Sequence, residues 1–247
     1  CNLAELLTWQ SDLGEAIRRC TEGAALARDV LFGQCEAFAH RVRATALMEA
    51  GDEAGAAQDL GIALATCMRH GLDDEMLATR FQAGRLALHR GMVDDAVREL
   101  QLALDAAIKR DTESYAPVVR ATLARAFALQ GRPEVAQPLL DAVEPVIETL
   151  ALPRQTELML AVAEACHTLN QQDTARHLAR QAAQQAAIRG FRAWALQGRV
   201  LLVQLTTGEE REKAKMEARA LADMVGETLS DELGVSFEAK IRACFDT

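Results

Sequence analysis

Apolar residues follow the three- and four-residue spacing of amphipathic helices along almost the whole chain. Short polar turns separate these runs, and the runs come in pairs of similar length. This pattern predicts an all-α protein built from antiparallel helix pairs. The pairs are expected at 34–49 with 53–69, 75–90 with 93–109, 115–130 with 133–149, 154–170 with 173–189, and 191–205 with 209–227.

The pairs repeat one another at a fixed interval. Gly51, Gly91 and Gly131 stand 40 residues apart, and each is followed five residues later by an alanine and nine later by a leucine. A period of this size marks a repeat array. The glycines fall where a tight turn joins two helices, which suits a residue able to adopt a positive φ. The leucines are expected to be core residues: Leu60, Leu100 and Leu140.

The two ends of the chain differ from the repeating helix pairs. Counting back 40 residues from Ala56 reaches Ala16, so 1–30 is interpreted as a truncated first repeat, and the chain as a fragment of a longer polypeptide. Residues 230–246 show one more amphipathic pattern, which is interpreted as a capping helix. We therefore expect a single solenoid over 1–247, with units at 1–30, 34–70, 74–110, 114–150, 154–189 and 191–227 and the cap at 230–246.

Three residues interrupt the helical pattern. Pro145 lies late in the helix expected at 133–149, where it should bend or end that helix. Gly84 and Gly198 lie inside helices, where glycine costs about 1 kcal/mol relative to alanine. We expect them at places where a neighbouring helix approaches closely.

The recurring residues resemble the tetratricopeptide repeat (TPR). Each turn glycine follows a small residue seven positions earlier, and in the sixth unit Trp194 and Gly198 match the tryptophan and glycine of that motif's first helix. The small residues are Ala44, Gly84 and Ala124. The unit here is 40 residues long, against about 34 in the family. The resemblance implies a TPR-like right-handed solenoid of about six helix pairs, whose first helices line a concave groove.

The long unit is similar to the helical repeat regions of large bacterial signal-transducing ATPases, transcription activators and kinases. That similarity implies a non-catalytic protein-interaction or sensor module that binds a partner protein or peptide in its groove. The alternative is a small-ligand or signalling-peptide receptor that switches attached catalytic or DNA-binding domains. A long polar groove lined by arginines favours the first function. A deep groove with an apolar patch around Phe38, Phe81 and Leu88 favours the second.

Composition and charge restrict the classes of partner and the cellular compartment that the sequence predicts. The net charge of −9 and the pI of about 5.1 argue against a general nucleic-acid or anionic-membrane surface, which needs a basic footprint. No apolar run reaches the ~18 residues of a membrane span. The six cysteines are scattered, so they are interpreted as reduced residues of a cytoplasmic protein. An exposed first helix could make the chain dimerise through its open N-terminal end.

A set of arginines is the candidate partner-binding site. Aligning the repeats puts Arg85, Arg125 and Arg199 at one position of the inner helix, with Arg41 and Gln82 one turn earlier. Guanidinium groups bind carboxylates and phosphates through paired hydrogen bonds, so this ladder predicts an anionic partner. The alternative is that these arginines form a solvated face or pair with acids within the array.

No catalytic set, cofactor motif or metal site is recognised. The chain contains neither a phosphate-binding loop nor a kinase signature, and its four serines lie in no nucleophile motif. Zinc needs about four ligands. Only partial groups are present, Cys67 with His70 and Cys166 with His167 and His177. The sequence therefore predicts a protein that is not an enzyme and uses no cofactor.

Overall fold

The computed structural model describes residues 2–110 and 115–245, and these residues form only helices and turns. The expected unit start at 114, the end of the cap at 246 and residue 1 lie outside the described residues. The all-α prediction is confirmed. The α-helices are α1 (Asn2–Gln10), α2 (Leu13–Asp29), α3 (Gly33–Glu49), α4 (Glu53–His70), α5 (Asp73–His89), α6 (Val93–Lys109), α7 (Ala116–Leu129), α8 (Pro133–Asp141), α9 (Arg154–Thr168), α10 (Gln172–Arg189), α11 (Arg192–Leu205), α12 (Gly208–Gly226) and α13 (Asp231–Phe245), and a 3-10 helix, η1 (Glu144–Thr149), follows α8.

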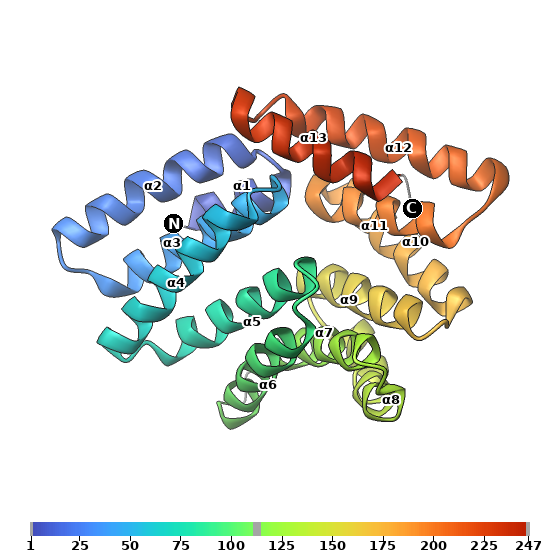
Figure 1. Cartoon of the computed structure of the whole chain (residues 1–247), viewed down its shortest axis with the longest axis horizontal. Helices are drawn as coiled ribbons and strands as arrows, with labels where there is room; N and C mark the ends of the chain where they lie inside the picture. Colours follow the sequence, from blue (N-terminus) through green and yellow to red (C-terminus); the bar gives the residue numbers. More distant parts are fainter. Residues whose placement is uncertain (1, 111–114, 246–247) are drawn as a thin grey trace.

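Consecutive helices pair and form two layers around a centre (Figure 1). The odd-numbered helices from α1 to α11 face the centre, and the even-numbered helices from α2 to α12 lie outside. The repeated alanines stand where the helices pack, and all are fully buried: Ala16, Ala56, Ala96, Ala136 and Ala175. The predicted core leucines Leu60, Leu100 and Leu140 are 4%, 0% and 5% exposed, which confirms their burial.

The turns inside the first five pairs share one backbone conformation. The residue that follows the first helix by one or two positions has φ between 61° and 86° in each of these pairs. Glycine adopts this left-handed conformation at no steric cost, and asparagine tolerates it better than other residues. The five residues are Ser11, Gly51, Gly91, Gly131 and Asn170.

Pro145 ends its helix, as predicted. Helix α8 stops at Asp141, and the chain continues as the 3-10 helix η1 from Glu144. A proline ring clashes with the carbonyl four residues earlier and has no N–H to donate, so Pro145 disfavours continuation of α8 beyond Asp141. The second helix of this unit is therefore shorter than the expected 133–149.

Gly84 and Gly198 lie at close helix contacts, which confirms the sequence interpretation. A Cβ atom on Gly84 would lie 2.5 Å from Cγ of Leu100. One on Gly198 would lie 2.8 Å from Cβ of Ala183. Both distances are too short for real carbon contacts, so only glycine permits these approaches.

The array curves until its first and last units meet. Trp9 of α1 stacks on Trp194 of α11, with ring centroids 5.6 Å apart, and its edge faces Phe191 at 6.0 Å. The Thr228 hydroxyl donates a hydrogen bond of 3.3 Å to the main-chain oxygen of Ser11. Aromatic pairs of this kind contribute about 0.5–1.5 kcal/mol beyond their buried area. The helices thus form a closed ring (Figure 1).

Helix α13 packs on more of the array than the sequence predicts. It packs on the last unit as expected, but it also reaches across to the first (Figure 1). Phe237 and Ile241 are buried in a cluster that includes Leu13 and Ala50. The cap therefore bridges both ends of the ring.

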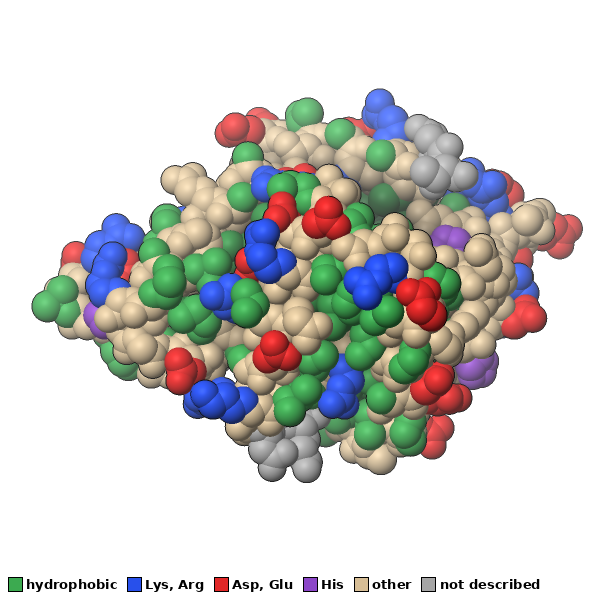
Figure 2. Space-filling view, turned by 60° about the horizontal axis from the view of Figure 1, so that its bottom comes forward, with side chains coloured by type: hydrophobic (Ala, Val, Ile, Leu, Met, Phe, Trp, Pro, Cys, Tyr) green, Lys and Arg blue, Asp and Glu red, His purple; other side chains and the backbone are tan. Residues whose placement is uncertain are grey.

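Charges are well mixed on the face shown in Figure 2. Basic side chains there are interspersed with acidic and apolar ones and form no continuous basic surface. Among the described helices, none is long and apolar enough to cross a membrane.

Leu100→Ala should lower the free energy of unfolding by about 2–5 kcal/mol, because the side chain is fully buried and leaves a cavity. Leu102 lies on the same helix and is 42% exposed. Leu102→Ala is the matched control, with an expected change within about 0.5 kcal/mol. Urea unfolding followed by circular dichroism measures both, and equal costs would contradict the assigned packing.

Gly14→Ala should destabilise the ring where α2 meets the turn after α12. The added Cβ would lie 2.0 Å from the main-chain oxygen of Thr228, and such overpacking costs about 1–3 kcal/mol. Gly61 lies inside α4, and a Cβ atom added there would have nothing within 4 Å, so Gly61→Ala should instead stabilise by about 1 kcal/mol. Thermal unfolding of the two variants should shift in opposite directions, and a stabilised Gly14→Ala variant would show that the ring is open in solution.

Candidate functional site

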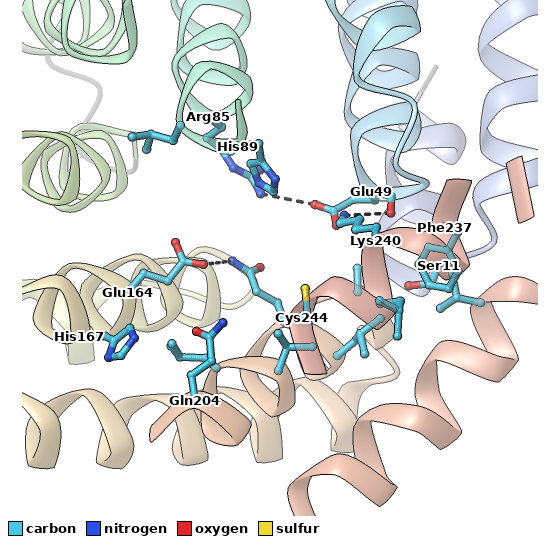
Figure 3. Close-up of a pocket in the computed structure, with 18 of the residues that line it drawn as sticks. Ser11, Glu49, Arg85, His89, Glu164, His167, Gln204, Phe237, Lys240 and Cys244 are labelled. Atoms are coloured by element: carbon cyan, nitrogen blue, oxygen red, sulfur yellow. Dashed lines mark hydrogen bonds and ion pairs between the residues drawn. The ribbon is translucent and has the colours of Figure 1, made fainter. Parts of the chain in front are cut away.

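A cavity of about 320 Å³ lies at the centre of the ring. Helices α3, α5, α7, α9 and α11 supply most of its lining from the array, α2 and α12 add one residue each, and α13 supplies the remaining side (Figure 3). Ligand sites in proteins commonly have volumes of about 300–1,000 Å³. The cavity is thus at the small end of that range.

The cavity has two chemically different walls. The apolar wall comes from α2, α11, α12 and α13, and the charged wall comes from the C-terminal halves of the other inner helices together with α13. The apolar wall contains Leu13, Leu196, Val200, Val225, Phe237 and Ile241. The charged wall contains Glu49, Arg85, His89, Arg125, Glu164 and Lys240.

Lys240 connects the cap to the charged wall. Its ammonium group donates to the main-chain oxygens of Met48 at 3.1 Å and Glu49 at 3.0 Å, and it lies 3.4 Å from the Glu49 carboxylate. The carbonyls at the end of α3 have no partners within the helix and carry partial negative charge, so a cation is favourable there. The contact fixes α13 over the cavity (Figure 3).

Arg85 and Arg125 face the cavity, and both touch acidic groups. Arg85 lies 3.5 Å from Glu49 and donates to the Gln82 amide oxygen at 3.2 Å. Arg125 pairs with Glu164 at 2.5 Å. Glu164, which interrupts the ladder in the sequence, therefore neutralises its neighbour, and it also accepts a 2.8 Å hydrogen bond from Gln197.

Arg41 and Gln82 line a smaller neighbouring cavity of about 40 Å³. Arg41 is 6% exposed, pairs with Glu75 and Glu5, and lies over the Phe38 ring. Burial alone would lower the pKa of Arg41, but Glu75 and Glu5 raise it above its usual value. Arg41 is thus held as a buried cation with its own partners.

The structure turns Arg199 away from the other arginines. It pairs with Glu217 of α12 at 2.8 Å and is not part of the cavity lining. Helix α11 faces the cavity through Gln197 and Val200 instead. The Glu217 carboxylate holds the Arg199 guanidinium toward α12, so this side chain is directed away from the cavity. The expected alignment of Arg199 with Arg85 and Arg125 is therefore corrected.

The two carboxylates of the cavity are held ionised. Burial would raise the pKa of Glu49, but Lys240 and Arg85 bring it below its usual value. Burial would likewise raise the pKa of Glu164, but Arg125 and the hydrogen bond from Gln197 lower it. Their negative charges therefore persist at neutral pH.

His89 is a titratable group on this wall that forms neither an ion pair nor a side-chain hydrogen bond with the described residues. Its side chain is exposed to the cavity and lies close to Glu49 (Figure 3). Desolvation by the surrounding protein, together with the positive charge of Lys240, lowers the pKa of the His89 imidazole below its ordinary value of 6.5.

Nothing in the local sequence marks His89 or Lys240 as site residues. Lys240 is separated from Glu49 by 191 residues, and their contact depends on closure of the ring. Leu88, part of the expected apolar patch, does line the cavity, but Phe81 is 1% exposed and belongs to the core. Only the three-dimensional path of the array shows which residues meet at the centre.

The histidine and cysteine groups noted in the sequence do not converge. Cys166 is buried, and burial raises the pKa of its thiol to about 11. His167 faces the cavity, whereas His177 is exposed on α10. Within residues 2–110 and 115–245, no group of three or more His, Cys, Asp or Glu side chains could hold a metal ion.

Comparison with known proteins gives matches to solved structures only. No family model and no curated protein matches the chain. A kinesin light chain protein of Podosopora anserina with nearly identical TPR-like repeats aligns at TM-score 0.52 and 20% identity, over 76% of this chain and 93% of that chain. A variant of that protein aligns at 0.53 and 21%, over 78% and 93%. BtubC (BKLC) from P. vanneervenii aligns at 0.54 and 17%, over 87% and 90%.

The chain has a TPR-like fold. The alignments span most of this chain and nine-tenths or more of each matched chain, which confirms the resemblance drawn from the repeated glycine, alanine and leucine positions. Arrays of this TPR-like type generally mediate protein–protein interaction through their curved surfaces. At 17–21% identity, the likeness concerns the fold alone.

Lys240→Met should raise the pKa of His89. The substitution removes a nearby positive charge and leaves Glu49 to attract the imidazolium. Nuclear magnetic resonance of the ring protons, assigned with His89→Gln, measures the midpoint. In the wild type it should lie below 6.5, and Lys213→Met on the exposed face of α12 should leave it unchanged.

The lowered pKa of His89 makes the stability of the fold depend on pH. The folded state resists protonation of His89, so its pKa is lower in the folded chain than in the unfolded chain. The stability that neutral His89 permits is fully present above the unfolded-state pKa, and it is lost as the pH falls through the folded-state pKa. An unchanged His89 midpoint in Lys240→Met would contradict the assigned contact between α13 and the charged wall.

Proposed function

We propose that this chain is a non-catalytic sensor module that binds a small ligand or short peptide in the central cavity. In this proposal it belongs to a larger cytoplasmic regulatory protein of bacteria and transmits occupancy of the cavity to attached domains. The observation that carries the proposal is the closure of the ring, because it brings the first helix pair, the last helix pair and the cap together around one cavity.

The cavity suits a compact ligand better than an extended chain. Its volume of about 320 Å³ lies at the small end of the range for ligand sites, about 300–1,000 Å³. Apolar and charged side chains both line it, and such a combination orients a small molecule. A long segment of a partner protein would have to displace α13.

Occupancy of the cavity can act on the whole ring. The lining includes Leu13 from the first helix pair, Leu196 from the last and Phe237 from the cap. A ligand that touches all three binds the closed ring differently from an opened one. A ligand shifts a conformational equilibrium by its difference in affinity for the two states, so binding here would favour closure.

A second candidate is a partner-protein site in the concave groove, with α13 displaced. The amphipathic α13 already occupies the mouth of the ring, so a helix of similar pattern could take its place. Arg41, Gln82, Arg85 and Arg125 would then meet an anionic partner. The matched structures support this candidate because they carry TPR-like repeats. A dimer through α1 would use its exposed Leu3 and Leu6.

The test exposes the purified chain to a low-molecular-mass extract of the source organism and records native mass spectra. Val200→Trp fills the cavity, and Met216→Trp places the same ring on the exposed face of α12 as the control. We expect added mass on the wild type and the control and none on Val200→Trp, with equal helicity by circular dichroism.

A different outcome would favour the partner-protein candidate. If the extract leaves every spectrum unchanged, whereas one protein of the full lysate binds the wild type and not an Arg85→Glu/Arg125→Glu variant, the sensor proposal fails. Retention of the same protein by that variant would also exclude the arginines as its site.

A further inference from the structure

We infer that the central cavity selects a small apolar monoanion, namely a carboxylate with a short hydrocarbon body. The inference rests on the proposal that this cavity is a ligand site, and it specifies the ligand's chemistry. Charge, available hydrogen-bond donors, wall composition and size each support it.

The cavity carries an excess positive charge inside an acidic protein. Arg85, Arg125 and Lys240 face it together with only two carboxylates, whereas the whole chain has a net charge of −9. The adjoining cavity of about 40 Å³ is balanced, because three arginines and three glutamates line it. The excess comes from Lys240 of α13.

Arg85 is the cation with the weakest partners. Lys240 is satisfied by two main-chain oxygens at 3.0–3.1 Å, and Arg125 holds Glu164 at 2.5 Å. Arg85 has contacts at 3.2 and 3.5 Å, and its guanidinium offers five N–H donors. It also lines the two smaller cavities beside the central one. A carboxylate would therefore bind at Arg85, beside His89 (Figure 3).

The apolar wall determines the chemistry of the rest of the ligand. Leu196, Val200, Phe237 and Ile241 offer no side-chain hydrogen-bond donors or acceptors, so they favour a hydrocarbon body. The two ionised carboxylates disfavour a second negative charge on the ligand, which argues against a phosphate dianion. A volume of about 320 Å³, at the small end for ligand sites, suits a compact ligand such as an eight-carbon carboxylate.

The experiment is isothermal titration of the whole chain with octanoate and with octanamide, which has the same number of non-hydrogen atoms and no charge. We expect octanoate to bind at least about tenfold more tightly, because hydrogen bonds to charged groups are stronger than neutral ones. Arg85→Gln should remove this preference. Arg199→Gln is the matched control, because Arg199 pairs with Glu217 outside the cavity, and should keep it.

Octylammonium and inorganic phosphate complete the set of probes. Tighter binding of either one than of octanoate would overturn the inference, as would the absence of octanoate binding. Equal binding of octanoate and octanamide, lost in Val200→Trp, would overturn the monoanion while leaving the cavity a ligand site. The extract experiment tests that site separately, so the two proposals fail on different observations.

Discussion

The meeting of the first and last units is the contact on which the central cavity depends. In an open repeat array each unit touches only its neighbours, and stability adds along the chain. Here Trp9 stacks on Trp194, and Lys240 binds the end of α3, so residues 185 and 191 positions apart in the sequence are held together. Without these contacts the first helix pair, the last helix pair and the cap would not line one cavity.

Much of the fold follows from local rules that act within one unit or between neighbours. Burial of Leu100 and the left-handed turn at Gly51 repeat every 40 residues because each pair solves the same packing problem. The end of α8 before Pro145 follows from the proline ring itself. Sequence periodicity contains this information, so the helices and the core could be predicted.

The site could be predicted only in part, because small differences in the rotation of successive helix pairs accumulate around the ring. Arg85 and Arg125 share one register and face the cavity, whereas Arg199 is rotated toward Glu217. Closure also depends on the path of six pairs, each of which adds its own rotation. The contact between Lys240 and Glu49 is the result of that path and leaves no mark in the local sequence.

Glu49 connects the closing contact to the cavity. It lies 3.4 Å from Lys240 of the cap and 3.5 Å from Arg85 of the proposed site, so two cations share one carboxylate. An anion that engages Arg85 would leave Glu49 to Lys240 alone and would strengthen the attachment of α13. Coupling free energies are reciprocal, so a ring held closed by α13 would in turn bind that anion more tightly. A single shared carboxylate is thus sufficient, in the proposed sensor, to link occupancy of the cavity to closure of the ring.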